Sequence, residues 1–209
     1  MNTHSKKVAL NGYLTFAIVI TTLLPMFDYY GHSPTGTKAY DRFIFYFLIP
    51  LALLLLVYRA NPREYGLTLG DWREGMLWVV GVGLVMGGFL WFFARAPEMS
   101  AYYTRAVERY GGIEWALFLT AVDLFAWEFI WRGFLLFILA KHLGIGPAIF
   151  LQAVPFAFMH LGKPELETYS TIFGGAGFGL IAWRTRSMIY PFLIHWLISG
   201  VTLVVATLV

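Results

Sequence analysis

Long apolar segments alternate with short polar ones along almost the whole chain. A helix needs about 20 mostly apolar residues to cross a bilayer, or somewhat fewer where charged side chains at its ends reach the membrane surface. By this rule the pattern predicts seven membrane-spanning helices, at about residues 8–27, 43–58, 75–94, 114–140, 146–161, 169–183 and 188–208. The predicted fold is all-α, a polytopic membrane helical bundle that forms one integral membrane domain over residues 1–209.

The predicted helices differ in length and in their content of helix-breaking residues. Segment 114–140 is long enough to tilt or to project beyond the bilayer, whereas 146–161 and 169–183 are short and contain proline or glycine. We expect these two short segments to be broken or to line a cavity. Gly175 and Gly179 are four residues apart, a spacing that lets two helices approach closely.

The composition agrees with a membrane protein. Of the 209 residues, 59% are hydrophobic and 13% are charged, whereas soluble domains contain about 25% charged residues. The net charge of +3 does not indicate nucleic-acid binding, because no basic run is longer than Lys6-Lys7. The absence of cysteine excludes disulfides, cysteine nucleophiles and cysteine-ligated metal sites.

The polar segments indicate an orientation and one further helix. If the N-terminus is cytoplasmic, the cytoplasmic segments carry eight lysines or arginines and the external ones carry six. This difference favours a cytoplasmic N-terminus and an external C-terminus. The apolar run after Lys7 is as long as a full span and precedes no small-residue cleavage site, so we interpret it as a retained helix. Segment 97–112 mixes charged and apolar residues and is predicted to be an amphipathic helix at the membrane interface.

Ionisable residues within the predicted spans are the main candidates for chemistry. Glu128 and Arg132 are four residues apart, so they lie on one face of a helix and can pair. One charge at the centre of a spanning helix costs about 2.5–3.5 kcal/mol, which pairing offsets only in part. Asp123 lies in the same span and is a candidate partner for a polar group on another helix.

Further candidates lie near the last three predicted spans. They are His160, the loop residues Glu165 and Glu167, and His195 with Ser199 one turn later. Taken singly, each has a simpler explanation: an interfacial histidine, a solvated carboxylate, or a serine that joins two helices. Together they predict one internal site, since each of these groups would be costly facing lipid. A carboxylate and histidines in such a site are suited to general acid–base chemistry.

The order of three motifs resembles the CAAX protease and bacteriocin-processing family, also called the ABI family. The motifs are ExxxRG at Glu128, FxxxH ending at His160, and HxxxS from His195 to Ser199. The resemblance covers about residues 113–205, which we take as the protease-family core, and residues 1–112 as variable N-terminal spans.

The resemblance implies an intramembrane glutamic endopeptidase without a cofactor or metal. Its expected substrate is a membrane-associated protein or peptide, and its expected partners are this substrate and the lipid bilayer. In the family a glutamate activates a water, and two histidines and a later polar residue bind this water or stabilise the oxyanion. Arg132, His160 and His195 match the motif positions, and Ser199 lies where asparagine is often found.

The first motif departs from the family pattern, which has two consecutive glutamates. Glu128 matches the second glutamate, and Trp127 occupies the position of the first. Three interpretations stay open: Glu128 acts as the base, Glu165 or Glu167 replaces the missing carboxylate, or the chain is a non-catalytic relative that binds peptides. We favour retained proteolysis, because both histidines and the arginine are present.

Within this family, WEF at 127–129 and GKPELET at 162–168 look similar to myxosortase-like bacterial members. This similarity implies cleavage of C-terminal sorting segments at the bacterial inner membrane. Three other classes also fit parts of the pattern. His160, His195 and a glutamate form a candidate zinc metalloprotease site, and the two histidines are candidate haem ligands. A transporter would use the same polar cavity for binding only.

Overall fold

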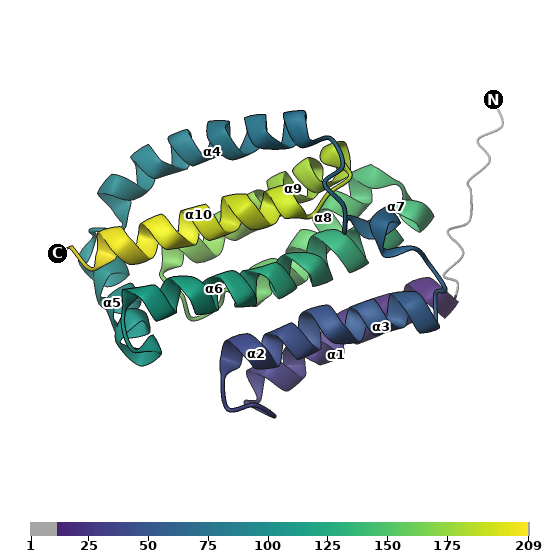
Figure 1. Ribbon diagram of the computed structural model, residues 1–209, viewed down its shortest axis with the longest axis horizontal. Coiled ribbons are helices and arrows are strands. Elements are labelled where there is room, and N and C mark those ends of the chain that lie inside the picture. Colours follow the sequence, from purple (N-terminus) through teal and green to yellow (C-terminus); the bar gives the residue numbers. More distant parts are fainter. Residues whose placement is uncertain (1–11, 209) are drawn as a thin grey trace.

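The structure is a computed structural model that describes residues 12–208, and all regular secondary structure among them is helical. The predicted all-α membrane bundle is confirmed (Figure 1). The elements are α1 (Gly12–Tyr29), α2 (Lys38–Arg42), η1 (Phe43–Leu48), α3 (Ile49–Leu56), η2 (Pro62–Tyr65), α4 (Trp72–Phe93), α5 (Pro97–Tyr110), α6 (Ile113–Glu128), η3 (Phe129–Leu135), α7 (Leu136–Leu143), α8 (Ile145–Phe158), α9 (Glu165–Thr185) and α10 (Ile189–Ala206).

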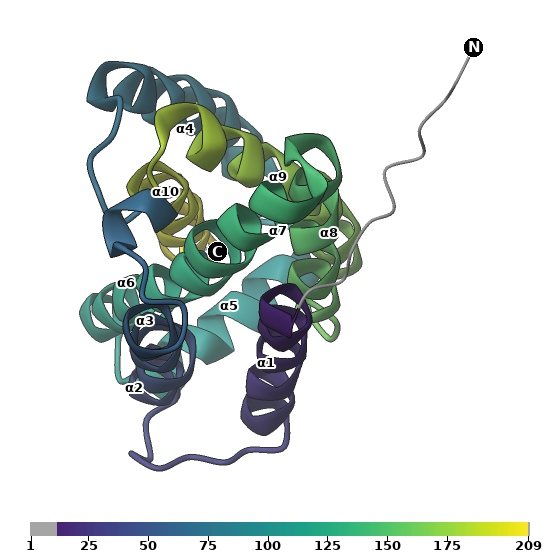
Figure 2. The same cartoon turned by 90° about the vertical axis from the view of Figure 1, so that its right-hand side faces the viewer.

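One continuous helix, α6–η3–α7, runs through the centre of the bundle. Every residue from Ala126 to Leu139 is buried, and Figure 2, which looks along the helices, shows α7 surrounded by its neighbours. The middle segment η3 is a π-helix, a wider turn that often occurs at functional sites. This central helix explains why the predicted span 114–140 is unusually long, since it continues from Ile113 to Leu143.

Helices α8 and α9 pack closely because glycine leaves room between them. A Cβ atom on Gly175 would lie 2.9 Å from the Phe156 ring and 3.1 Å from the Ala153 Cβ, both on α8. A Cβ atom on Gly179 would lie 2.7 Å from Gln152. The predicted close approach at this glycine pair is therefore confirmed. Helix α9 is continuous from Glu165 to Thr185, and its residues Thr171, Gly174 and Phe178 line a cavity. Of the two alternatives expected for segment 169–183, it therefore lines a cavity and is not broken.

Helix α4 lies on the outside of the bundle beside α9 and α10 (Figure 1). Only Gly75 and Leu90 of its 22 residues are buried, and most of its apolar side chains are exposed. Such a surface fits lipid rather than water.

The loops at one end of the bundle, the Tyr65 end, comprise residues 57–71, 144 and 186–188. The Met188 amide donates to the Gly66 carbonyl (3.0 Å), and the Asp71 amide donates to the Thr185 carbonyl (2.9 Å). These bonds join the segment before α4 to the segment before α10.

The loops at the other end, the His160 end, comprise residues 30–37, 94–112 and 159–164. Segment 97–112 is confirmed as helical, since α5 runs from Pro97 to Tyr110 and ends at Gly111, whose φ is +84°. The Ser100 hydroxyl of α5 donates to the Ala206 carbonyl of α10 (2.7 Å), which holds α5 across this end. Its position at the membrane interface stays a prediction.

Four helical segments are long and apolar enough to cross a membrane: Gly12–Tyr29, Lys38–Leu56, Trp72–Phe93 and Ile189–Ala206. They coincide with four of the seven predicted spans, apart from residues 8–11 of the first, which lie outside the described residues. The total of seven stays a prediction. Helix α8 is short, with 14 residues, and the central helix carries Asp123, Glu128 and Arg132.

Candidate active site

Glu128 lies at the end of α6, in the middle of the bundle, and is completely buried. Its Oε1 atom accepts hydrogen bonds from Arg132 Nη1 (3.1 Å) and from His195 Nδ1 (2.7 Å) on α10. The predicted pairing of Glu128 with Arg132 is thus present, and His195 joins it from another helix. A carboxylate can only accept here, so His195 Nδ1 carries the proton and Nε2 is its free ring nitrogen.

Arg132 is also fully buried and has three partners besides Glu128. Its Nη2 donates to the Gly175 carbonyl (3.3 Å), and the guanidinium lies 4.0 Å from the centre of the Phe156 ring and 5.3 Å from that of Phe178. Aromatic faces attract cations, particularly where water is excluded. These contacts offset part of the cost of removing the guanidinium from water.

A cavity of about 440 Å³ lies beside this ion pair, towards the His160 end. His160, His195 and Ser199 all lie in its wall, together with apolar side chains of α4, α9 and α10. His160 Nδ1 donates to the Phe156 carbonyl (2.9 Å), so its Nε2 is left as the free ring nitrogen. The structure therefore brings four of the predicted site residues to one cavity, these three and Glu167. Glu128 lies behind this wall and reaches the cavity through His195.

The two loop glutamates have different surroundings. Glu167 lies in the cavity wall, where it accepts from the Tyr103 hydroxyl (2.5 Å) and from Lys163 Nζ (2.7 Å). Burial raises the pKa of Tyr103, so its hydroxyl stays a donor at neutral pH. Burial opposes the charge of Lys163, but Tyr103 and Glu167 outweigh this effect and raise its pKa. Glu165 is exposed and does not line the cavity.

Asp123 lies outside this site. It pairs with Arg42 Nη1 (2.9 Å), and Arg42 Nη2 also contacts Asp28 (2.8 Å), so one arginine joins α1, α2 and α6. Arg42 is one of the six lysines and arginines assigned to external segments from the sequence, but its side chain is only 14% exposed. The sequence contains little indication of this three-residue cluster, because Asp28 and Arg42 lie at the edges of two predicted spans and not within them.

Trp127 lies between the cavity and the cluster formed by Arg42, Asp28 and Asp123. The Arg42 guanidinium is 4.8 Å from the centre of the Trp127 ring, and the His160 ring is 6.0 Å away at a steep angle. Trp127 is 3% exposed, and its Nε1 has no hydrogen-bond partner among the described residues. The tryptophan thus fills the space next to His160 with an aromatic ring in place of a carboxylate.

Gln152 was not predicted as part of the site. It is fully buried on α8, and its Nε2 donates to the Gly175 carbonyl (2.8 Å), the same oxygen that accepts from Arg132. In the sequence, the only indication that Gln152 belongs to the site is its position as a single glutamine within the apolar segment 146–161. Gln152 helps to hold the acceptor that orients Arg132.

Within residues 12–208, no three His, Asp or Glu side chains are grouped so that they could hold a metal ion. His160 and His195 share a cavity, but His195 Nδ1 is already bonded to Glu128.

The site lies within a segment that matches a known family. Residues 110–201 match the family model of the Type II CAAX prenyl endopeptidase Rce1-like proteins, close to the predicted core of 113–205. No curated protein and no solved structure matches the chain. Residues 110–201 of this integral membrane protein therefore resemble the Rce1-like CAAX prenyl endopeptidases, a family of proteases.

Proposed function

We propose that the protein is an intramembrane endopeptidase in which Glu128 and His195 together activate a water molecule. The observation that carries the proposal is the 2.7 Å hydrogen bond from His195 Nδ1 to Glu128 at the wall of a cavity. The protease-family match over residues 110–201 supports the reaction class.

The proposed mechanism divides the catalytic roles between two residues. The free Nε2 of His195 takes a proton from the water molecule while the water oxygen attacks the carbonyl carbon of the substrate. Glu128 holds the imidazole in the required tautomer and stabilises the imidazolium that forms, as the carboxylate of a catalytic triad does. His195 then gives the proton to the leaving amine as the C–N bond breaks.

His160 and Ser199 have complementary proposed roles. With Nδ1 bonded to the Phe156 carbonyl, neutral His160 can only accept at Nε2, so it is suited to orienting the attacking water. The Ser199 hydroxyl can donate, so it is suited to stabilising the oxyanion of the tetrahedral intermediate. Both residues lie in the same cavity wall as His195.

The cavity walls favour an apolar substrate. The cavity is lined by Phe89 and Phe93 of α4, Phe178 of α9 and Ile198 of α10, and its wall is mostly apolar. We propose a membrane-associated protein or peptide as substrate. The resemblance to myxosortase-like members extends this proposal to a C-terminal sorting segment at the bacterial inner membrane.

A non-catalytic peptide binder is the second candidate function, and the buried Trp127 favours it. Its ring lies beside His160, where the family resemblance places the missing glutamate. Glu167 is a further candidate base, because it lies in the cavity wall. However, both of its oxygens already accept hydrogen bonds from Tyr103 and Lys163.

The test is cleavage of membrane-anchored C-terminal segments by the purified protein in detergent. We expect Glu128→Gln and His195→Gln to lower the cleavage rate about 100- to 10,000-fold, the usual contribution of general acid–base catalysis. Glu165→Gln is the matched control and should leave the rate unchanged, because Glu165 is exposed and outside the cavity. Thermal unfolding of each variant shows whether it remains folded.

Other outcomes would each identify a different function. If Glu167→Gln abolishes cleavage and Glu128→Gln does not, the base is Glu167. If a chelator abolishes cleavage and zinc restores it, the protein is a metalloprotease. If the wild type cuts no substrate but Trp127→Glu does, the chain is a peptide binder that lost its base.

A further inference from the structure

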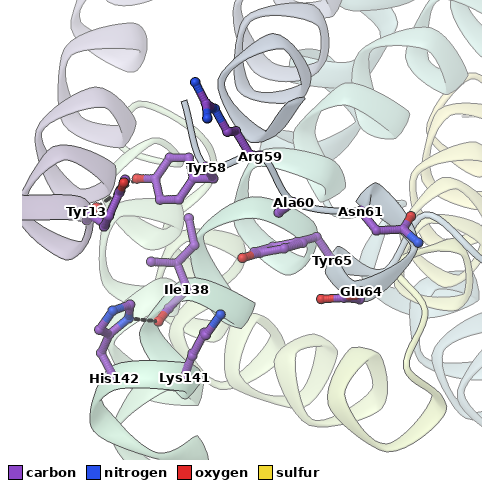
Figure 3. A pocket seen from close by; sticks show the side chains of 10 residues that line it. All are labelled: Tyr13, Tyr58, Arg59, Ala60, Asn61, Glu64, Tyr65, Ile138, Lys141 and His142. Atoms are coloured by element: carbon purple, nitrogen blue, oxygen red, sulfur yellow. Dashed lines mark hydrogen bonds between the residues drawn. The ribbon is translucent and has the colours of Figure 1, made fainter. Parts of the chain in front are cut away.

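A second cavity, of about 450 Å³, lies at the Tyr65 end of the bundle, and Figure 3 shows the side chains that line it. Its walls come from the start of α1, the loop 58–61, η2 and the end of α7. Small-molecule sites in proteins have volumes of about 300–1,000 Å³. No residue of this cavity takes part in the proposed peptidase site.

The walls of this cavity carry more positive than negative groups. Lys141 and Arg59 are the cations, His142 is a further basic group, and Glu64 is the acid. Within residues 12–208, neither Lys141 nor Arg59 lies within 4.0 Å of a carboxylate oxygen. Lys141 is directed into the cavity, whereas Arg59 lies on its outer rim (Figure 3). An anion in the cavity would therefore meet a lysine that no acidic side chain neutralises.

The Tyr65 hydroxyl is a donor that opens to the cavity and that no described residue engages. Tyr65 is 7% exposed, its ring packs edge-on to Phe137 at 6.4 Å, and its oxygen points into the cavity (Figure 3). Burial, and to a lesser extent Glu64, raise the pKa of Tyr65, so the hydroxyl keeps its proton at neutral pH. Because this hydroxyl has no protein partner and opens to the cavity, it is free to donate to a ligand with acceptor oxygens.

The backbone at the rim is held in a rare conformation. Arg59 has a φ of +50°, in the left-handed region that side chains other than glycine seldom adopt. The Tyr58 hydroxyl donates to the Tyr13 carbonyl (2.7 Å), and the Ala60 amide donates to the Leu54 carbonyl (2.9 Å). These hydrogen bonds fix the backbone on both sides of Arg59, so the turn at the rim of the cavity is held in one conformation.

The cavity lies beside the ends of two helices that are long and apolar enough to cross a membrane. These helices are Gly12–Tyr29 and Lys38–Leu56, and Tyr13 and Tyr58 stand at those ends. Tyrosines mark the level of lipid headgroups, and lysines near that level attract anionic lipids.

We propose that this cavity binds a phosphate group, with Lys141 as its counter-ion and the Tyr65 hydroxyl as a hydrogen-bond donor. A phosphate offers several acceptor oxygens and a negative charge, which matches both groups. The phosphate can come from the headgroup of an anionic lipid or from a soluble phosphate. The position at the ends of two spans favours the lipid.

The experiment measures binding to the purified full chain in a non-ionic detergent. The probes are short-chain phosphatidylglycerol, short-chain phosphatidylcholine and inorganic phosphate. We expect phosphatidylglycerol to bind, and Lys141→Gln and Tyr65→Phe each to weaken binding on the order of tenfold, the usual effect of losing a hydrogen bond to a charged group. Tyr65→Phe keeps the ring that packs on Phe137, so the fold should persist.

Arg63→Gln is the matched control. It removes one positive charge from η2, but Arg63 is exposed and does not line the cavity, so it should weaken binding by less than about threefold. Binding of inorganic phosphate with the same variant pattern would support the site and identify a soluble phosphate as its ligand. Equal losses in Arg63→Gln and Lys141→Gln, or no binding of either anionic probe, would overturn the proposal.

Discussion

Glu128 and Arg132 are an ion pair buried at the centre of the bundle, with neither side chain exposed. The attraction between two buried charges rarely repays the cost of removing both from water. Arg132 gains further partners in the Gly175 carbonyl and the Phe156 ring, yet its Nε and the Glu128 Oε2 have no hydrogen-bond partner among the described residues. Such a pair lowers the stability of the fold or contributes little to it, which fits a role in chemistry better than a role in stability.

Removing one member of the Glu128–Arg132 pair should lower the free energy of unfolding more than removing both members. We expect Arg132→Met to lower the free energy of unfolding by about 3–5 kcal/mol, because it leaves Glu128 buried without its cation. The double variant Glu128→Leu with Arg132→Met should recover most of that loss. Thermal or denaturant unfolding in detergent measures both. Equal losses in the single and the double variant would contradict the view that the uncompensated charge is the cause.

In the central helix, the π-helix η3 and Gly133 determine how the ExxxRG motif packs. The π-helix η3 follows Glu128 directly and contains Arg132 and Gly133. A Cβ atom on Gly133 would lie 3.0 Å from the Tyr65 carbonyl oxygen, so glycine lets the loop at the Tyr65 end approach this helix. The glycine of the ExxxRG motif therefore has a packing reason that the motif alone did not reveal.

The contact between α8 and α9 depends on single glycines. We expect Gly175→Ala to lower the free energy of unfolding by about 1–3 kcal/mol, because the new methyl group would press on Phe156 and Ala153. Gly177→Ala is the control on the same helix, where no atom lies within 4 Å of the added Cβ. It should raise the free energy by about 0.5–1 kcal/mol through helix propensity. Unfolding of the two variants measures this, and an equal effect of both would refute the packing explanation.

The N-terminal helices are tied to the family core mainly at the His160 end. Arg42 contacts Asp28 of α1 and Asp123 of α6, and the Tyr46 hydroxyl also donates to Asp28 (2.9 Å). One arginine thus joins residues outside the matched segment 110–201 to residues inside it. The Trp127 ring lies against the same guanidinium, so this cluster also adjoins the candidate active site.

Loss of Arg42 should loosen the whole N-terminal part. We expect Arg42→Gln to lower the free energy of unfolding by about 3 kcal/mol, because both aspartates lose their cation in a site that is largely shielded from water. Hydrogen exchange should become faster in α1 and α2. Arg105→Gln is the control, since Arg105 is exposed on α5 and makes no ion pair within the described residues. Unchanged exchange in Arg42→Gln would show that the cluster does not hold these helices.

Local pattern was sufficient for the helices and for one half of the site. Apolar run length predicted the four helices that are long and apolar enough to cross a membrane. Four-residue spacing predicted the contact of Glu128 with Arg132, because it depends only on the helical repeat. The cost of polar groups in lipid also predicted that His160 and His195 would meet in one cavity, as they do.

Contacts between distant segments could not be obtained in this way. Asp123 and Glu128 lie on the same helix, yet Asp123 pairs with Arg42 and Glu128 with His195. Glu165 and Glu167 differ by two positions, and only Glu167 faces the cavity. The helical repeat decides which side chains share a face. Which faces meet depends on the packing of all helices at once, because a hydrogen bond or ion pair requires a separation of a few ångströms that no local pattern specifies.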